Sequence, residues 1–433
     1  MSAVFRDADL DGRRTDVLVA GDAVIGVGDG LAADEIIDCN GCALLPGLHD
    51  HHIHVLALAA RQHSLDVSEG DLARALKAAP GTGWIRATGY HEPGENRLDR
   101  HLLDALVPDR PVRVQHRSGA LWVLNSRALE LVPLDSSPDV ERDEAGEPTG
   151  RLWRYDSRLR AALPDSVVDM AAVGSALASY GITGITDATP DLDSAGLALL
   201  DLLPQHVTTL SAAGTGPRKL ALRDHDLPAL DELTKLVEDV HAAGRPVAVH
   251  CVTRVSLLLT LAALESAGAV AGDRIEHASV VPDGSADRIA RLGLRVVTQP
   301  SFLTVRGDDY IRDVAADDLP CLYPYASLLA AGVPVCASSD APYGPVDPWQ
   351  AILSARDRMT SSGTTIGGSE RVPARTALDG YLSAADEPGG RPRRIEPGAP
   401  ADLVLLIRPL DDALRRPSAE LVRSTWIGGT LVT

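Results

Sequence analysis

Aromatic side chains are scarce in this sequence. They make up 3% of the 433 residues, and only two of them are phenylalanines. A core must therefore be built mainly from Ala, Val, Leu and Ile. No apolar run approaches the ~20 residues needed to span a bilayer. The first residues, MSAVFRDADLDGRRTD, also lack the apolar segment of a signal peptide. We therefore expect a cytoplasmic protein with no membrane partner.

Basic residues are fewer than acidic ones. The chain carries 41 Lys and Arg against 60 Asp and Glu, which gives a formal net charge of −19. This balance argues against a nucleic-acid partner, because broad contact with phosphates requires compensating cations. A small-molecule substrate is the expected partner, and the oligomeric state is open.

Cysteines are few and scattered. Five of them cannot all pair, and Cys39 and Cys42 form a single CxxC with no second copy. A zinc knuckle or a redox pair would suit this spacing, but a knuckle normally needs a second pair of ligands. We prefer to interpret the two cysteines as small residues that flank a turn. None of the five needs a disulfide in a reducing compartment.

The two ends of the chain differ from its middle. Residues 1–45 and 395–433 contain short β-branched runs that are separated by turns, as in TDVLVAGDAVIGVGDG and TWIGGTLVT. We expect these two segments to pair into one small β-sandwich module. The middle segment, 46–394, would then form a separate domain.

The middle repeats a helix-then-strand unit. An Ala- and Leu-rich helical stretch ends at a glycine and a short apolar run follows, as in LDELTKLVEDVHAAG before RPVAVHC. Leu230, Leu233, Leu236, Val237 and Val240 recur at helical spacing. Such alternation is typical of parallel strands covered by helices.

Counting strands distinguishes a barrel from an open sheet. Eight candidates are present: 43–48, 111–116, 182–188, 217–222, 246–251, 273–278, 294–299 and 333–339. Polar residues follow almost every one, as the active face of a barrel requires, whereas an open sheet concentrates its site at one switch point. We therefore predict an α/β fold with a (β/α)₈ TIM barrel.

The strongest chemical signal is ALLPGLHDHHIHV. In an extended segment His52 and His54 project to one side while Ile53 faces the other, so the two imidazoles can share one metal ion. His250 and His277 each end a later strand, and Asp340 ends the last one. A solvated histidine patch or satisfied core histidines are the alternatives. The repeated placement at strand ends favours metal binding.

These residues together resemble the amidohydrolase superfamily. PGLHDHHIHV resembles its PGxxDxHxH signature, His250 and His277 match the histidines of its fifth and sixth strands, and Asp340 matches its final aspartate. IEPGAPADLVLL resembles the motif at which the family's chain re-enters the β module. GYHEPGENRLD, NSRAL, GEPTGRLWR and IEHASVV are similar to the branch that includes N-substituted formamide deformylases. The resemblance covers essentially the whole chain but specifies no substrate.

The resemblance implies a metal-dependent hydrolase that cleaves C–N bonds. Its cofactor would be one or two divalent ions, zinc first, with iron or manganese as alternatives. The implied ligands are His52, His54, Lys219, His250, His277 and Asp340. Asp340 would carry the proton from water to the leaving nitrogen, and His277 is the second catalytic candidate.

The sequence leaves two states possible for Lys219, a carboxylated lysine and an unmodified one. Many members of the family carry a carboxylated lysine here, because a carbamate can bridge two metal ions and an ammonium cannot bind one. The sequence around it, ALRDHD, departs from the branch's usual pattern. An unmodified lysine, paired with Asp224 or Asp226, would favour a centre with one ion.

Substrate contacts are assigned to four side chains: His116, Trp122, Arg254 and Tyr343. Ordinary packing is the alternative for each of them. The reaction class also has rivals, namely a deaminase that releases ammonia and a lactonase or phosphotriesterase. A catalytically silent binding protein is the alternative from another class, but such a chain should have lost ligands, and here every expected metal position is filled.

Overall fold

The computed structural model describes residues 2–433 except 63, 69–70, 93–96, 156–157 and 160–168. The chain divides into two compact units, one formed by Met1–Val55 with Met170–Thr433 and the other by Leu56–Asp169. Among the described helices, none is long and apolar enough to cross a membrane.

Eight parallel strands form the centre of the larger unit. Three make a sheet in the order β14-β13-β6: β6 (Leu48–Ile53), β13 (Ile182–Asp187) and β14 (His206–Thr209). Five follow one another in a second sheet: β15 (Arg218–Leu220), β16 (Val247–Cys251), β17 (Arg274–His277), β18 (Arg295–Thr298) and β19 (Val335–Ala337). The predicted α/β class is confirmed.

The two parallel sheets are joined by isolated hydrogen bonds. The backbone N–H of Lys219 donates to Leu210 O at 2.9 Å, and that of Asp340 donates to His52 O at 2.8 Å. A closed barrel of eight paired strands, as predicted, is not formed by the described ladders. The strands at the two gaps are short, because β15 and β19 have three residues each and β14 has four, so they offer few backbone groups for a continuous ladder.

Two predicted strands lie elsewhere, and one observed strand was missed. Residues 43–48 overlap β5 (Leu44–Pro46), which pairs with a C-terminal strand, and the parallel strand β6 starts only at Leu48. Residues 111–116 correspond to β9 (Val112–His116), which belongs to the sheet of the smaller unit. The strand that joins the β6 sheet instead is β14, whose sequence HVTT is too polar to stand out. Apolar alternation does not reveal which sheet a strand joins, because that choice depends on distant pairing.

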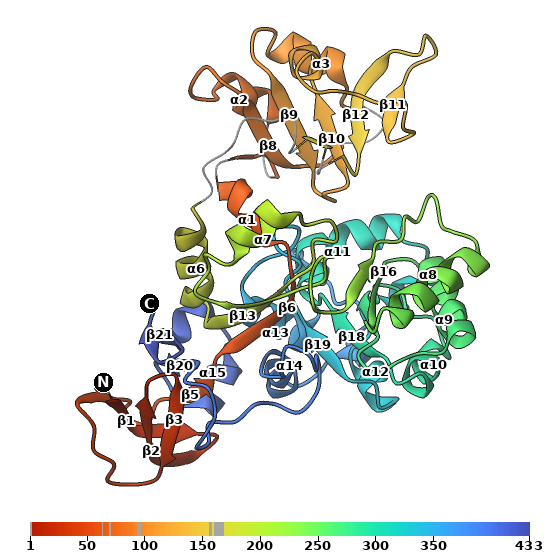
Figure 1. Ribbon diagram of the computed structural model, residues 1–433. Helices are drawn as coiled ribbons and strands as arrows, with labels where there is room; N and C mark the ends of the chain where they lie inside the picture. The colour runs from red at the N-terminus through yellow and green to blue at the C-terminus, as the bar shows by residue number, and fades with distance from the viewer. Residues whose placement is uncertain (1, 63, 69–70, 93–96, 156–157, 160–168) are drawn as a thin grey trace. The chain divides into compact units, whose positions relative to one another are not determined.

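Helices follow the parallel strands and cover them (Figure 1). Helix α8 (Leu230–Ala242) buries Leu233 and Val237 and leaves Leu230 and Leu236 exposed, so the packed stripe is narrower than predicted. Helix α9 (Arg254–Ala267) starts at Thr253, whose side chain accepts a hydrogen bond from Ser256 N. The other helices of this unit are α6 (Met170–Ser179), α7 (Ser194–Leu200), α10 (Ser285–Arg291), α11 (Ser301–Asp313), α12 (Ala326–Ala330), α13 (Pro348–Asp357), α14 (Ala374–Tyr381) and α15 (Leu410–Arg415). Helix α1 (Val55–Gln62) begins at the boundary between the units.

The chain ends form two further sheets of the larger unit, the first from N-terminal strands and the second from C-terminal strands together with β5. One has the order β3-β2-β1-β4 and is built from β1 (Ser2–Leu10), β2 (Arg13–Ala20), β3 (Ala23–Val27) and β4 (Glu35–Asp38). The other has the order β22-β21-β20-β5 and is built from β5 (Leu44–Pro46), β20 (Leu403–Leu406), β21 (Val422–Ile427) and β22 (Thr430–Leu431).

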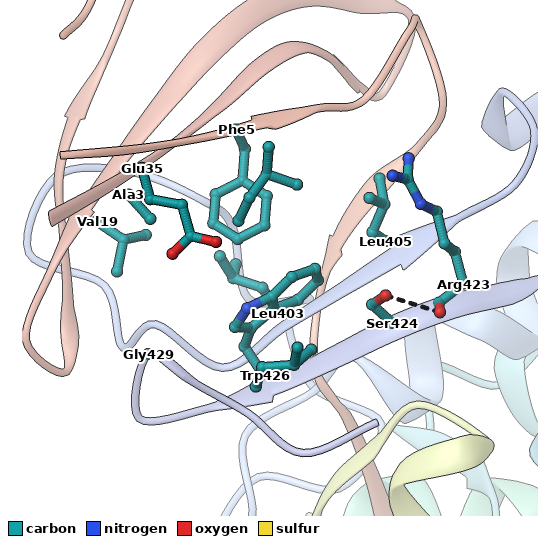
Figure 2. A pocket seen from close by; sticks show the side chains of 12 residues that line it. Ala3, Phe5, Val19, Glu35, Leu403, Leu405, Arg423, Ser424, Trp426 and Gly429 are labelled. Carbon is teal, nitrogen blue, oxygen red and sulfur yellow. Dashed lines mark hydrogen bonds between the residues drawn. The ribbon is translucent and has the colours of Figure 1, made fainter. Parts of the chain in front are cut away.

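The two terminal sheets share one hydrophobic cluster. The rings of Phe5 and Trp426 meet edge to face with centroids 4.7 Å apart. Both rings line a cavity of about 270 Å³. Figure 2 shows Glu35 and Arg423 among the other residues that line it. The two ends of the chain therefore share a hydrophobic core. The predicted β-sandwich module remains a proposal.

The smaller unit contains one six-stranded sheet. Its order is β11-β12-β10-β9-β8-β7, from β7 (Leu65–Asp66), β8 (Ile85–Tyr90), β9, β10 (Leu121–Leu124), β11 (Val140–Arg142) and β12 (Pro148–Trp153). Helices α2 (Leu72–Lys77), α3 (Arg100–Leu106) and α4 (Ser126–Leu129) accompany the sheet. This compact unit falls inside the range 46–394, which the sequence assigned to one barrel domain, and the predicted boundaries remain a proposal.

Candidate metal centre

The HxH pair lies at the carboxyl end of β6. Gly47 opens this strand where the chain passes against Thr183, and a Cβ atom at position 47 would collide with the Thr183 side chain. Only glycine allows β6 and β13 to approach so closely. His52 is buried at the end of the strand, and His54 follows it with 15% of its side chain exposed.

Asp340 joins the two histidines from the last parallel strand. Its Oδ1 atom lies 3.5 Å from His52 Nε2 and 3.5 Å from His54 Nε2. One ligand atom from each of the three residues fits within 4.8 Å of the others. Three of the predicted ligands therefore converge, and their nitrogen and carboxylate donors are those that divalent transition metals prefer.

The environment of Asp340 fits a cation. Among the described residues its buried Oδ1 atom has no hydrogen-bond partner, which is costly for a carboxylate. Burial raises the pKa of Asp340 to about 7, although the positive charges of Lys219 and Arg306 act in the opposite direction. A bound metal ion would supply the missing partner and hold the side chain in its charged form.

Both imidazoles of the pair are held in the neutral form that binds metals. Burial keeps the pKa of His52 and of His54 well below the usual value, and the positive charge of Lys219 adds to this. His52 Nδ1 is hydrogen-bonded to Glu276, so its Nε2 atom faces Asp340.

His277 and His250 lie beside this group. The ring centroid of His277 is 4.8 Å from that of His52 and 4.5 Å from that of His250. His277 donates from Nδ1 to Gln299 Oε1 at 2.7 Å, and Gln299 donates in turn to Ser338 Oγ at 2.8 Å. His277 has a φ of 70°, a rare conformation outside glycine, and such strain often accompanies functional sites.

Lys219 also faces the centre. Its side chain is buried in β15, and its Nζ atom lies 3.3 Å from His52 Nε2. Burial lowers the pKa of this amine, although the negative charges of Asp340, Glu276 and Asp187 act in the opposite direction. All six predicted ligands thus belong to the larger unit and end its parallel strands or lie near their ends.

Comparison with known protein families matches residues 35–433 to Amidohydro_3, an amidohydrolase family. The chain belongs to the amidohydrolase family. It is an enzyme, an amidohydrolase, and the resemblance seen in the sequence is confirmed.

Two curated relatives extend over most of this amidohydrolase. N-substituted formamide deformylase of Arthrobacter pascens is 26% identical and covers 96% of this chain and 94% of its own length. The amidohydrolase YtcJ of Bacillus subtilis is 25% identical, with 87% of each chain covered. An uncharacterized metal-dependent hydrolase from Pyrococcus horikoshii shares the fold, with a TM-score of 0.73, 21% identity and coverage of 94% of this chain and 98% of that one.

The substrate contacts predicted for the amidohydrolase are distributed over both units. Tyr343 lies in the larger unit, with its ring centroid 5.4 Å from that of His54. Arg254 donates from Nε to Asp318 at 2.8 Å, so its charge is already paired. His116 and Trp122 belong to the smaller unit. There His116 is hydrogen-bonded to Ser118, and Trp122 is buried under the guanidinium groups of two arginines.

Sequence reasoning missed two residues of the centre. Arg306 in α11 is close enough to influence the pKa of Asp340 and of His277, and its guanidinium lies 4.3 Å from the Phe302 ring centroid. Glu276 contacts His52 directly. The motif RIEH contained a signal for Glu276, because a charged residue inside an apolar strand requires a buried partner.

Proposed function

We propose that this amidohydrolase cleaves a C–N bond of a small amide, formamide or cyclic amide with water that a bound divalent metal activates. The observation that carries the proposal is the convergence of His52 and His54 on the Oδ1 atom of Asp340, which has no hydrogen-bond partner in the described part of the chain. The deformylase from Arthrobacter pascens, matched over nearly its whole length, supports the formamide class.

His52, His54 and Asp340 would hold the metal, with His250, His277 and Lys219 as further ligands. Zinc is the proposed ion because three or four imidazoles with a carboxylate suit it well, and iron or manganese would fit the same donors. When bound, such an ion lowers the pKa of its water towards ~7 and polarises the scissile carbonyl group.

Proton transfer is assigned to Asp340. Its side chain faces the ligand cluster and accepts the proton of the attacking water, which it then delivers to the leaving nitrogen. His277, whose Nδ1 atom is 4.0 Å from Asp340 Oδ2, is the second candidate for this role. Tyr343, next to His54, is proposed to contact the substrate. The roles given to His116, Trp122 and Arg254 stay predictions.

Lys219 determines whether one or two ions are expected. Its buried amine, close to His52, is well placed to react with carbon dioxide, and the carbamate would bridge two ions. Metal content per chain distinguishes the two states. Two ions in the natural protein and one in a Lys219→Ala variant support the carbamate, whereas one ion in both supports an unmodified lysine.

The reaction class is tested with a panel of N-formyl amines, N-acyl amines, cyclic amides and ring amines. Release of formate or another acid together with an amine supports the proposal, and an Asp340→Asn variant serves as the inactive control. Release of ammonia from ring amines would instead identify a deaminase. Turnover confined to lactones or phosphotriesters would contradict cleavage of a C–N bond.

A further inference from the structure

A buried chain of polar groups lies behind His52. Its Nδ1 atom is hydrogen-bonded to Glu276 Oε2, and the other oxygen of Glu276 accepts from Arg274 Nε. Arg274 then donates from Nη2 to the carbonyl oxygen of His51 at 3.0 Å. The side chains of His52 and Glu276 are fully buried, and that of Arg274 is 2% exposed.

The contacts form a closed frame between two strands. Arg274 and Glu276 are two residues apart on β17, so they project to the same side of that strand. Both of them reach β6, Glu276 through the His52 ring and Arg274 through the His51 carbonyl. The frame therefore links the imidazole to the backbone that carries it and restricts rotation of the ring.

We propose that Glu276 is a positioning residue of the metal centre. It accepts the Nδ1 proton of His52 and so leaves the lone pair of Nε2 directed at the metal, while Arg274 holds Glu276 in place. The inference rests on the proposed metal centre. Metal-bound histidines commonly donate their second ring N–H to a carboxylate, which selects the tautomer and the ring orientation.

The count of donors and acceptors explains why a carboxylate is needed. Glu276 serves two donors, His52 Nδ1–H and Arg274 Nε–H, with one oxygen for each. Glutamine has a single acceptor oxygen. If that oxygen faces Arg274, which has no acceptor of its own, the amide N–H₂ faces His52 Nδ1. The His52 proton must then move to Nε2, and the nitrogen that faces the metal loses its lone pair.

The first experiment compares zinc affinity in the full-length protein by competition with a chelator. We expect Glu276→Gln to weaken binding about 10- to 100-fold, the usual effect of removing such a partner. Asp273→Asn is the matched control, because Asp273 is also buried, immediately precedes β17 and is 3.0 Å from His241 Nε2, which is not among the proposed ligands. This control should lower the melting temperature without changing zinc affinity.

A second substitution separates tautomer selection from general damage. In Arg274→Met/Glu276→Gln the competing donor is gone, so the glutamine oxygen is available to His52 and the metal-binding tautomer returns. We expect the double variant to bind zinc more tightly than Glu276→Gln alone. Equal or weaker binding would contradict the role given to the carboxylate.

The natural protein gives a readout that needs no Glu276 variant to fold. In metal-depleted protein labelled with ¹⁵N-histidine, the His52 signal, identified by its loss in His52→Asn, should show a protonated Nδ1 and an unprotonated Nε2. The opposite tautomer would overturn the inference. If the natural protein binds no zinc, the proposed metal centre itself fails. If it binds zinc and Glu276→Gln binds equally well, only the positioning role fails.

Discussion

Asp340 donates its backbone N–H to the carbonyl oxygen of His52 at 2.8 Å, and the side chains of the same two residues face each other at 3.5 Å. The backbone contact joins the edges of the two parallel sheets at the point where both strands end. The distance between the imidazole and the carboxylate is thus set by main-chain hydrogen bonding, which preorganises the centre before a metal binds.

Metal binding should be stoichiometric and stabilising. We expect protein purified without chelator to carry at least one divalent ion per chain, because three ligand atoms already converge. Removing the ion should lower the melting temperature, since a ligand that binds only the folded state stabilises it. Elemental analysis and thermal unfolding measure both effects. Protein that holds no ion, and binds added zinc no more tightly than His52→Ala, would refute the centre.

Asp340 should matter more for turnover than for folding. Asp340→Asn preserves size but removes the negative charge and the basic site, so kcat should fall on the order of 10²- to 10⁴-fold. The histidines should still retain an ion, and the melting temperature should change little. Steady-state kinetics on the first substrate found, with metal analysis of the same sample, measure this. A nearly unchanged kcat would show that Asp340 is not the catalytic base, and His277 would then be the first candidate for that role.

The chain ends should unfold together. Trp426 is 7% exposed and packs against Phe5, so Trp426→Ala should cost about 3–5 kcal/mol and loosen the N-terminal sheet as well. Hydrogen exchange in residues 15–28 is the measurement. Leu431→Ala is the control, because that side chain is 58% exposed and should tolerate truncation. Unchanged exchange in residues 15–28 of the tryptophan variant would show that the two ends are independent.

An ion pair between the exposed His206 and the buried Asp402 should make stability depend on pH. His206 Nε2 lies 2.9 Å from Asp402, whose carboxylate raises the pKa of the histidine. Because the pKa of His206 is higher in the folded than in the unfolded protein, its ion pair stabilises the fold fully at pH values below the unfolded pKa of about 6.5. This stabilisation is lost as the pH rises through the pKa of the folded protein. The natural protein should therefore exceed His206→Gln in stability at about pH 5.5, by no more than about 1 kcal/mol because the pair is partly exposed and screened.

Thermal unfolding of both proteins from about pH 5.5 to 9 measures the effect of the pair. The difference between them should shrink as pH rises, and it should also shrink in high salt. A difference that is the same at every pH would show that His206 contributes only packing.

Much of the candidate metal centre could be predicted from the sequence, because the local geometry of a strand fixes the direction of its side chains. His52 and His54 lie two residues apart at the end of a strand, and the alternation of side chains places both on one side whatever the rest of the fold does. The same rule holds for His250 near the end of β16, His277 at the end of β17 and Asp340 after β19, because parallel strands present their carboxyl ends at one edge. The sequence by itself therefore determined the α/β class and the convergence of His52, His54 and Asp340.

Tertiary structure alone decided several other contacts between distant segments. Val112–His116 has the apolar pattern of a central strand but pairs in the smaller unit, and Arg254 is paired with Asp318, 64 residues further along the chain. Glu276 meets His52 across 224 residues. Periodicity determines which side of a strand a residue occupies. The partner that it meets there depends on the packing of the whole fold, because burial and hydrogen bonding between distant segments are decided only when the strands assemble.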